Sequence, residues 1–221
     1  LLGACAQFQK PLLLSTGMST LSEVRSAVSY VQKKGVHQLG LFQCTSAYPT
    51  FPENVHLRVM DTLRNTFHIP IGFSDHTPGV AISWAAVARG AALLEKHLTI
   101  SKQLPGPDHR ASLEPKEFRS LVKGIRAIER SLGASVKKVL DCEYGNRAVA
   151  RRSLAIRTRV LKGQKLTEEN VIALRPVGGL SASLFPNVIG RRAARLLSEG
   201  HRLEMRDILK KRGDGRGRWK K

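Results

Sequence analysis

The chain has 221 residues, 42% of them hydrophobic, which is enough for the core of one large domain or two smaller ones. It contains no run of 18 apolar residues, so the sequence excludes a transmembrane helix, and no membrane partner is expected. The formal net charge is +20, and residues 147–221 hold 20 of the 37 basic and 6 of the 17 acidic side chains.

Strand and helix signals alternate through the first 133 residues. Short apolar runs predict strands at 10–16, 39–45, 69–74 and 91–97, and helical spacing follows them at 21–35, 55–63, 79–90 and 121–132. Thr20 and Glu23 form a capping-box pattern before the first helix, and Gly133 ends the last one. Four consecutive βα units predict an α/β fold with a parallel sheet.

The pattern changes between Asp141 and Arg152. Short strand and turn signals follow, without a long amphipathic helix, and predict a small, irregular, mostly β domain. We therefore divide the chain into an α/β domain over 1–140, a linker over 141–150, a β domain over 151–209 and a basic disordered tail over 210–221.

The tail holds seven Lys or Arg residues against one Asp. Such a segment could contact nucleic acid or an acidic surface. No aromatic RNA-binding signature accompanies the charge, so nucleic acid is not an expected partner, and a solvated extension without function is favoured. The three cysteines have no metal-binding spacing, which favours a reduced, cytoplasmic protein.

Two histidines end neighbouring strand runs. His76 follows Asp75, and His97 comes two residues after Glu95. Because one helix joins the two strands, their carboxyl ends should lie side by side at the rim where α/β proteins build active sites. A single histidine is most often structural, but two imidazoles flanked by carboxylates favour a divalent metal. Two neutral histidines leave coordination positions open, which suits Mn²⁺ or Mg²⁺ better than a closed structural zinc site.

Hydroxyl side chains also gather at the predicted strand ends, where they could bind a phosphate or a carboxylate. They are Ser15, Thr16, Ser46 and Ser74. Serine and threonine are equally common as helix caps, so each alone is a weak signal. Tyr48 comes just after a strand end, which favours the rim over the core, and Asp108 belongs either to a site or to a simple turn.

Five segments carry a resemblance to a known family: Leu14–Met18, Cys44–Pro49, Gly72–Thr77, Glu95–Thr99 and Gly106–Asp108. In order and spacing they resemble the N-acetylneuraminate (sialic acid) synthase family. The sequence around Leu174–Pro176 and Ile189–Arg191 resembles the antifreeze-like SAF domain of that family. The resemblance implies the C-terminal half of a TIM barrel, about four βα units, followed by a small, mostly β SAF domain.

The family condenses phosphoenolpyruvate with N-acetylmannosamine, or its 6-phosphate, to give a sialic acid and phosphate. By that resemblance His76 and His97 would hold Mn²⁺ (or Mg²⁺), which would polarise the sugar aldehyde as a Lewis acid. Glu95, Asp108 and Tyr48 would be the catalytic residues, with Glu95 positioning a water on the metal side.

The resemblance also assigns substrate contacts. Ser15, Ser46 and Ser74 match positions that bind phosphoenolpyruvate, although Ser46 stands where some members carry Asn. Tyr48 and Asp108 match sugar contacts. Arg175 matches an arginine that the SAF domain offers to the partner subunit in a domain-swapped homodimer, where its planar fork suits polar sugar groups and anions.

The family barrel has eight βα units, and only four are expected here. Four parallel strands cannot close such a barrel and would leave two exposed edges. The sequence therefore predicts a fragment, a truncated gene model or a degenerate copy that is inactive, or nearly so, by itself.

Two alternatives stay open. One is a non-catalytic remnant or a SAF binding module with a basic tail, which would have no reason to keep Ser74, Asp75, His76, Glu95 and His97 together. The other is a legionaminate or pseudaminate synthase, because the residues that select the sugar lie partly in the missing half.

Overall fold

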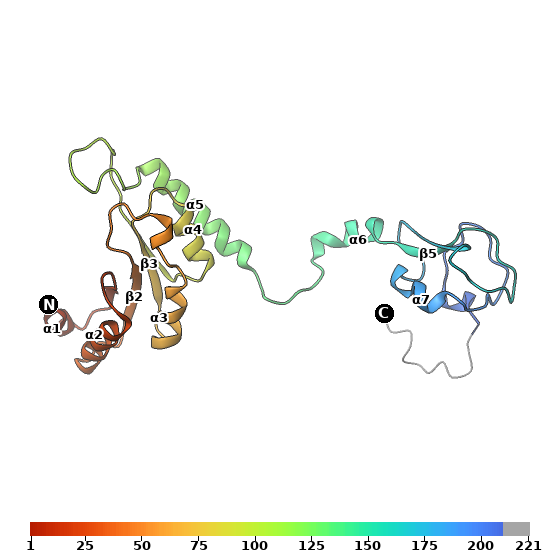
Figure 1. Ribbon diagram of the computed structural model, residues 1–221, viewed down its shortest axis with the longest axis horizontal. Helices are drawn as coiled ribbons and strands as arrows, with labels where there is room; N and C mark the ends of the chain where they lie inside the picture. The colour runs from red at the N-terminus through yellow and green to blue at the C-terminus, as the bar shows by residue number, and fades with distance from the viewer. Residues whose placement is uncertain (210–221) are drawn as a thin grey trace. The chain divides into compact units, whose positions relative to one another are not determined.

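The computed structural model describes residues 1–209, which form two compact units, one of residues 1–135 and one from residue 136 onward (Figure 1). The predicted basic tail, 210–221, lies outside the described residues. Within residues 1–209, no helix is long and apolar enough to cross a membrane.

A four-stranded parallel sheet forms the centre of the first unit. Its strands follow chain order and are β1 (Leu12–Ser15), β2 (Leu39–Cys44), β3 (Ile71–Asp75) and β4 (Leu93–Lys96). The register pairs Cys44 with Ser74 and Ser74 with Glu95, so the carboxyl ends of the strands meet at one rim. The predicted α/β architecture of four βα units is confirmed.

Five helices accompany this sheet: α1 (Leu2–Gln7), α2 (Leu21–Lys33), α3 (Val59–Phe67), α4 (Ala81–Ala88) and α5 (Pro115–Leu132). The predicted capping box starts α2, since the Glu23 amide donates to Thr20 Oγ1 and the Thr20 amide donates to the Glu23 carboxylate. The helix expected from Val55 begins only at Val59. Pro52–Asn54 forms a separate 3₁₀ turn, η1, and His56 has a left-handed φ of 50° that interrupts the helix.

The helices α2, α3 and α4 cover one face of the sheet (Figure 1). Buried apolar side chains from these helices pack on alternate strand residues: Val24, Val28, Val31, Met60, Leu63 and Ala86 on Leu39, Leu41, Ile71 and Phe73. The remaining strand residues face the other way, because side chains alternate along a strand.

The opposite face is apolar near its base. A Cβ on Gly72 would lie 2.6 Å from the Phe42 ring, and a Cβ on Gly40 would lie 2.9 Å from Leu13. The two glycines therefore leave room for these larger neighbours to lie across the sheet, which gives the inner face an apolar layer beneath its polar rim.

Replacing Gly124 of α5 with alanine is expected to destabilise the first unit by about 1–2 kcal/mol. The Trp84 indole donates to the Leu121 carbonyl at 3.1 Å, and a Cβ on Gly124 would lie 2.3 Å from that ring. The clash outweighs the roughly 1 kcal/mol that alanine gains in helix propensity. Urea unfolding followed by circular dichroism measures the loss. A Cβ on Gly145 meets nothing within 4 Å, so G145A is the control, and an unchanged midpoint for G124A would contradict the packing argument.

The second unit contains one small antiparallel sheet, β5 (Ser153–Ile156) with β6 (Val171–Leu174). Its other elements are short: η2 (Asp141–Glu143), α6 (Tyr144–Ala150), η3 (Ala182–Leu184), α7 (Phe185–Val188) and η4 (Met205–Asp207). In the rest of this unit, up to residue 209, strand pairing is limited to isolated bridges, such as Lys165 with Arg192. The irregular, mostly β region is confirmed. The segment proposed as a linker, 141–150, is exposed and helical.

Candidate active site

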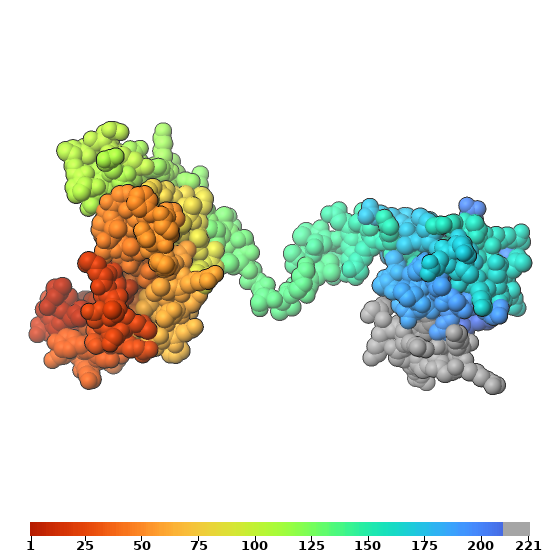
Figure 2. Space-filling view, in the orientation of Figure 1, coloured from red at the N-terminus to blue at the C-terminus, as the bar shows by residue number. Residues whose placement is uncertain are grey.

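The inner face of the sheet carries a line of polar side chains at the carboxyl rim. Strand alternation brings Cys44 of β2, Ser74 of β3 and Glu95 of β4 to the same level of the register. His76 and His97 follow two residues later on the same face. The loops after β2 and β4 lie at this end of the unit, drawn in orange and yellow-green (Figures 1 and 2).

Three aromatic rings meet at this rim. The imidazole centroids of His76 and His97 lie 5.3 Å apart in an edge-on arrangement, and the Tyr48 ring lies 4.2 Å from His76 and 5.6 Å from His97. His76 is buried, whereas a third of the His97 side chain is exposed. Residues from three loops therefore converge, as predicted for His76, His97 and Tyr48.

A backbone contact sets the tautomer of the neutral His76 ring. Its Nδ1 lies 2.8 Å from the Thr45 carbonyl oxygen, which can only accept a hydrogen bond. Nδ1 therefore carries the proton, and in the neutral ring Nε2 keeps its lone pair. Metal-binding histidines are oriented in the same way, by donating their other nitrogen to a carbonyl.

Carboxylates and a phenol complete the polar rim. The Ser74 hydroxyl donates to Glu95 Oε1 at 2.7 Å, and Asp108 Oδ2 lies 4.0 Å from His97 Nδ1. Partial burial raises the pKa of Tyr48, and the nearby negative charges of Asp108 and Glu95 raise it further. Tyr48 is therefore a neutral hydroxyl donor at pH 7.

Cys44 and Gly17 also belong to this rim, and the sequence did not single them out. Burial raises the pKa of the Cys44 thiol, against hydrogen bonds from Ser74 and Ser46, so the thiol stays protonated at neutral pH. A Cβ on Gly17 would lie 2.2 Å from Ser46 Oγ. The glycine thus permits the loop after β1 to approach Ser46. Because side chains alternate along a strand, Cys44 could have been placed on the same face as Gly40 and Phe42.

Not every predicted residue joins the cluster. Within residues 1–209, no polar contact links Ser15 to the histidines. Ser15 is exposed at the end of β1, on the same face as Leu13, and it also borders a small cavity of about 150 Å³. The Thr16 hydroxyl donates to the Phe42 carbonyl at 2.8 Å and so has a structural role. Arg175 is exposed in the second unit.

The interpretation that Asp75 flanks the two imidazoles is wrong. Asp75 is fully buried on the helix side of the sheet, where its carboxylate pairs with Lys96. The reason is strand alternation: Ser74 and His76 face the rim, so the residue between them faces away. Burial lowers the pKa of Lys96, and the Asp75 charge opposes that shift.

Two imidazoles are the metal donors that this rim brings together. Within residues 1–209, no three His, Cys, Asp or Glu side chains form a ligand group. The His76–His97 pair alone fits an ion that keeps positions open for water and substrate, since both rings are near and the His76 tautomer is suitable. Two imidazoles leave coordination positions open, so the pair does not fit a closed four-ligand zinc site.

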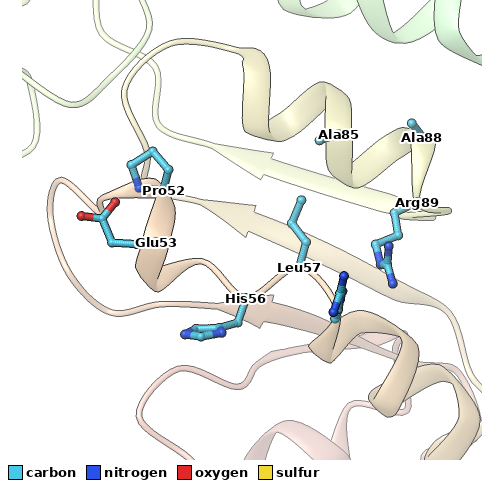
Figure 3. Close-up of a pocket in the computed structure, with 8 residues that line it drawn as sticks. Pro52, Glu53, His56, Leu57, Ala85, Ala88 and Arg89 are labelled. Atoms are coloured by element: carbon cyan, nitrogen blue, oxygen red, sulfur yellow. The ribbon is translucent and has the colours of Figure 1, made fainter.

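A shallow surface groove of about 740 Å³ lies elsewhere, between the η1–α3 segment and α4 (Figure 3). Leu57 points across it towards Ala85, and Glu53, His56 and Arg89 also line it. Its lining includes none of the rim residues, so the groove is not part of the candidate site.

Known proteins match both units. The NeuB family matches residues 1–137, and the SAF domain matches residues 151–205. The N,N'-diacetyllegionaminic acid synthase of Legionella pneumophila is 42% identical over 200 residues, which are 89% of this chain and 56% of the relative. The pseudaminic acid synthase of Helicobacter pylori is 33% identical over 208 residues, 94% of this chain and 61% of the relative.

A solved structure gives the same result. The N-acetylneuraminic acid (sialic acid) synthetase of Leptospira borgpetersenii, in complex with citrate, superposes with a TM-score of 0.61 at 36% identity, over 66% of this chain and 50% of that chain. The chain thus spans about half the length of such relatives. The resemblance to the sialic acid synthase family is confirmed, and the chain belongs to the NeuB family and carries a SAF domain.

Proposed function

We propose that this chain contributes half of the active site of a sialic acid synthase-type enzyme, which condenses phosphoenolpyruvate with N-acetylmannosamine or its 6-phosphate. The observation that carries the proposal is the convergence of Tyr48, His76 and His97 beside the Ser74–Glu95 hydrogen bond at one rim. Relatives named as legionaminic and pseudaminic acid synthases support the reaction class.

In the proposed reaction, C3 of phosphoenolpyruvate bonds to the aldehyde carbon of the sugar. Water then adds at C2, and phosphate leaves by cleavage of its C–O bond. Ser15 and Ser46 would bind the anionic groups of phosphoenolpyruvate, since their hydroxyls donate to carboxylate and phosphate oxygens. Ser74 would do so when its hydroxyl hydrogen turns from Glu95 to the ligand. Glu95 would orient the incoming water and accept a proton from it, and Tyr48 and Asp108 would hold the sugar.

His76 and His97 would hold Mn²⁺, or Mg²⁺ in its place. A divalent ion there supplies Lewis-acid polarisation of the aldehyde oxygen. The contribution of the chain is to present the His76 Nε2 lone pair, which the Nδ1 contact to Thr45 keeps free of a proton.

Sequence identity favours a second candidate for the sugar. The Legionella relative is named as a diacetyllegionaminic acid synthase, so a diacetylated sugar is the alternative substrate. We also propose that Arg175 reaches the site of a partner subunit in a domain-swapped homodimer; its exposure in the second unit is compatible with that role.

A chimera tests the proposed function. The part of the Legionella relative that this chain does not match is joined to this chain, and phosphate release from phosphoenolpyruvate is measured with Mn²⁺ and each candidate sugar. Sugar-dependent release, lost in the H76A/H97A form of the chimera, is the expected result. A chimera that folds cooperatively and binds Mn²⁺ but releases no phosphate with any of the sugars contradicts the proposal.

The 221-residue chain by itself is expected to release no phosphate above the protein-free rate. Within the described chain β1 pairs only with β2 and β4 only with β3, so the rim forms one wall of a site that stays open to water. Catalysis by such enzymes depends on groups fixed around the reacting atoms. Sugar-dependent phosphate release by the purified chain with Mn²⁺ would overturn this expectation.

A further inference from the structure

An ion pair lies behind the two histidines, on the helix side of the sheet. Lys96 Nζ lies 3.1 Å from Asp75 Oδ2, and the two side chains are 1% and 0% exposed. The residues are register partners across β3 and β4, and each directly precedes one of the histidines. The pair therefore joins the two strands at the point where the polar rim begins.

Further hydrogen bonds tie the residue after His76 to the same pair. Asp75 Oδ1 accepts from the amide and the hydroxyl of Thr77, both at 2.8 Å, and Lys96 donates to the Thr77 carbonyl. His76 thus lies between Asp75, which belongs to the pair, and Thr77, which is hydrogen-bonded to it. Ser83 of α4 donates to the other carboxylate oxygen, which fixes the pair to the helix layer.

Stability alone does not explain the choice of charged residues here. Removing two charges from water is unfavourable, and replacing a buried ion pair by well-packed apolar residues is often neutral or stabilising. The contacts of this pair instead converge on the backbone that flanks His76 and His97. Hydrogen-bond partners of metal-binding histidines commonly change metal affinity 10–100-fold when replaced. Asp75 and Lys96 act one step further back, through the backbone that carries the two rings.

We propose that Asp75 and Lys96 are positioning residues, which fix the ends of β3 and β4 so that the His76 and His97 imidazoles face each other. The inference deepens the proposed function and rests on it for the shared role of the two rings. It assigns no contact with substrate to either residue.

The test uses the full chain and the double variant D75N/K96M, which removes both charges together and leaves no unpaired one. Long-range ¹H–¹⁵N spectra of the metal-free protein report the imidazole tautomers, and Mn²⁺ titration followed by electron paramagnetic resonance reports affinity. In the wild type His76 carries its proton on Nδ1. In the variant we expect a mixture of His76 tautomers and an affinity for Mn²⁺ lower by about 10–100-fold.

The control is D61N/R89M, which removes the ion pair between Asp61 of α3 and Arg89 beside α4, on the partly exposed helical surface. Both readouts should keep their wild-type values in this control. A D75N/K96M variant that folds and keeps both the His76 tautomer and the Mn²⁺ affinity overturns the proposal.

The two readouts separate this inference from the proposed function. If the wild type binds no Mn²⁺ but the variant still shifts the His76 tautomer, the metal-binding function fails and the positioning role stands. If D75N/K96M does not unfold cooperatively, S83A takes its place, because it removes one donor from Asp75 and leaves the ion pair. A partial shift of the His76 tautomer then supports the role, and an unchanged spectrum overturns it.

Discussion

Replacing His76 with alanine is expected to weaken Mn²⁺ binding by this chain more than about 100-fold, because the loss of a ligand should exceed the 10–100-fold effect of a supporting residue. The proposed site has two protein nitrogens, and the His76 Nε2 is the one whose lone pair the structure fixes. H97A is expected to have a similar effect. Titration with Mn²⁺, followed by the free-ion paramagnetic signal, measures the change.

His37 provides the matched control. It is exposed in a connection and has an ordinary φ, whereas His56 and His68 have left-handed φ values that strain alanine. H37A should bind Mn²⁺ as the wild type does. Because H76A removes one of the hydrogen bonds that the Thr45 carbonyl accepts, circular dichroism must show that the variant is folded. Wild-type affinity in folded H76A would exclude His76 as a ligand.

Most of the first unit could be predicted from local signals. Thr20 and Glu23 placed the start of α2, and the apolar runs placed all four strands, because a buried parallel strand needs a short continuous apolar segment. Two features were missed for physical reasons. Leu2–Gln7 is too short to show helical periodicity, and the left-handed φ of His56 that delays α3 leaves no mark in the apolar pattern.

The candidate site could be predicted as a set of residues but not as a geometry. His76 and His97 were found because each ends a strand run, and strand ends of neighbouring βα units meet. Asp75 was misplaced because adjacency in sequence is not adjacency on a strand face. Lys96 was passed over for a related reason: its role depends on a cross-strand partner 21 residues away, which only the register reveals.

The conversion of Asp207 to alanine is expected to destabilise the second unit by about 3 kcal/mol, a large part of the stability of a small domain. The Asp207 side chain is fully buried and accepts from Arg195 Nε at 2.8 Å, His201 Nε2 at 2.7 Å and the Glu204 amide at 2.9 Å. Its removal ends two charge-assisted contacts and leaves the Glu204 amide unpaired. Hydrogen exchange of peptides from 153–209 during urea titration measures the change in this unit alone.

The pH dependence gives Asp207 an independent signature. Burial alone would raise its pKa, but hydrogen bonds from His201, the Glu204 amide and Arg195 outweigh that effect and lower the pKa. A carboxyl whose pKa is lower in the folded state stabilises it above its unfolded value of about 3.9, and the contribution disappears as pH falls further. The second unit should therefore lose stability below about pH 4, with a shallower loss in D207N.

R206A is the control: it removes only the exposed contact to Glu204 and should change the stability of the unit by less than about 0.5 kcal/mol. Equal pH profiles for wild type and D207N would show that the His201 and Arg195 contacts do not stabilise the unit.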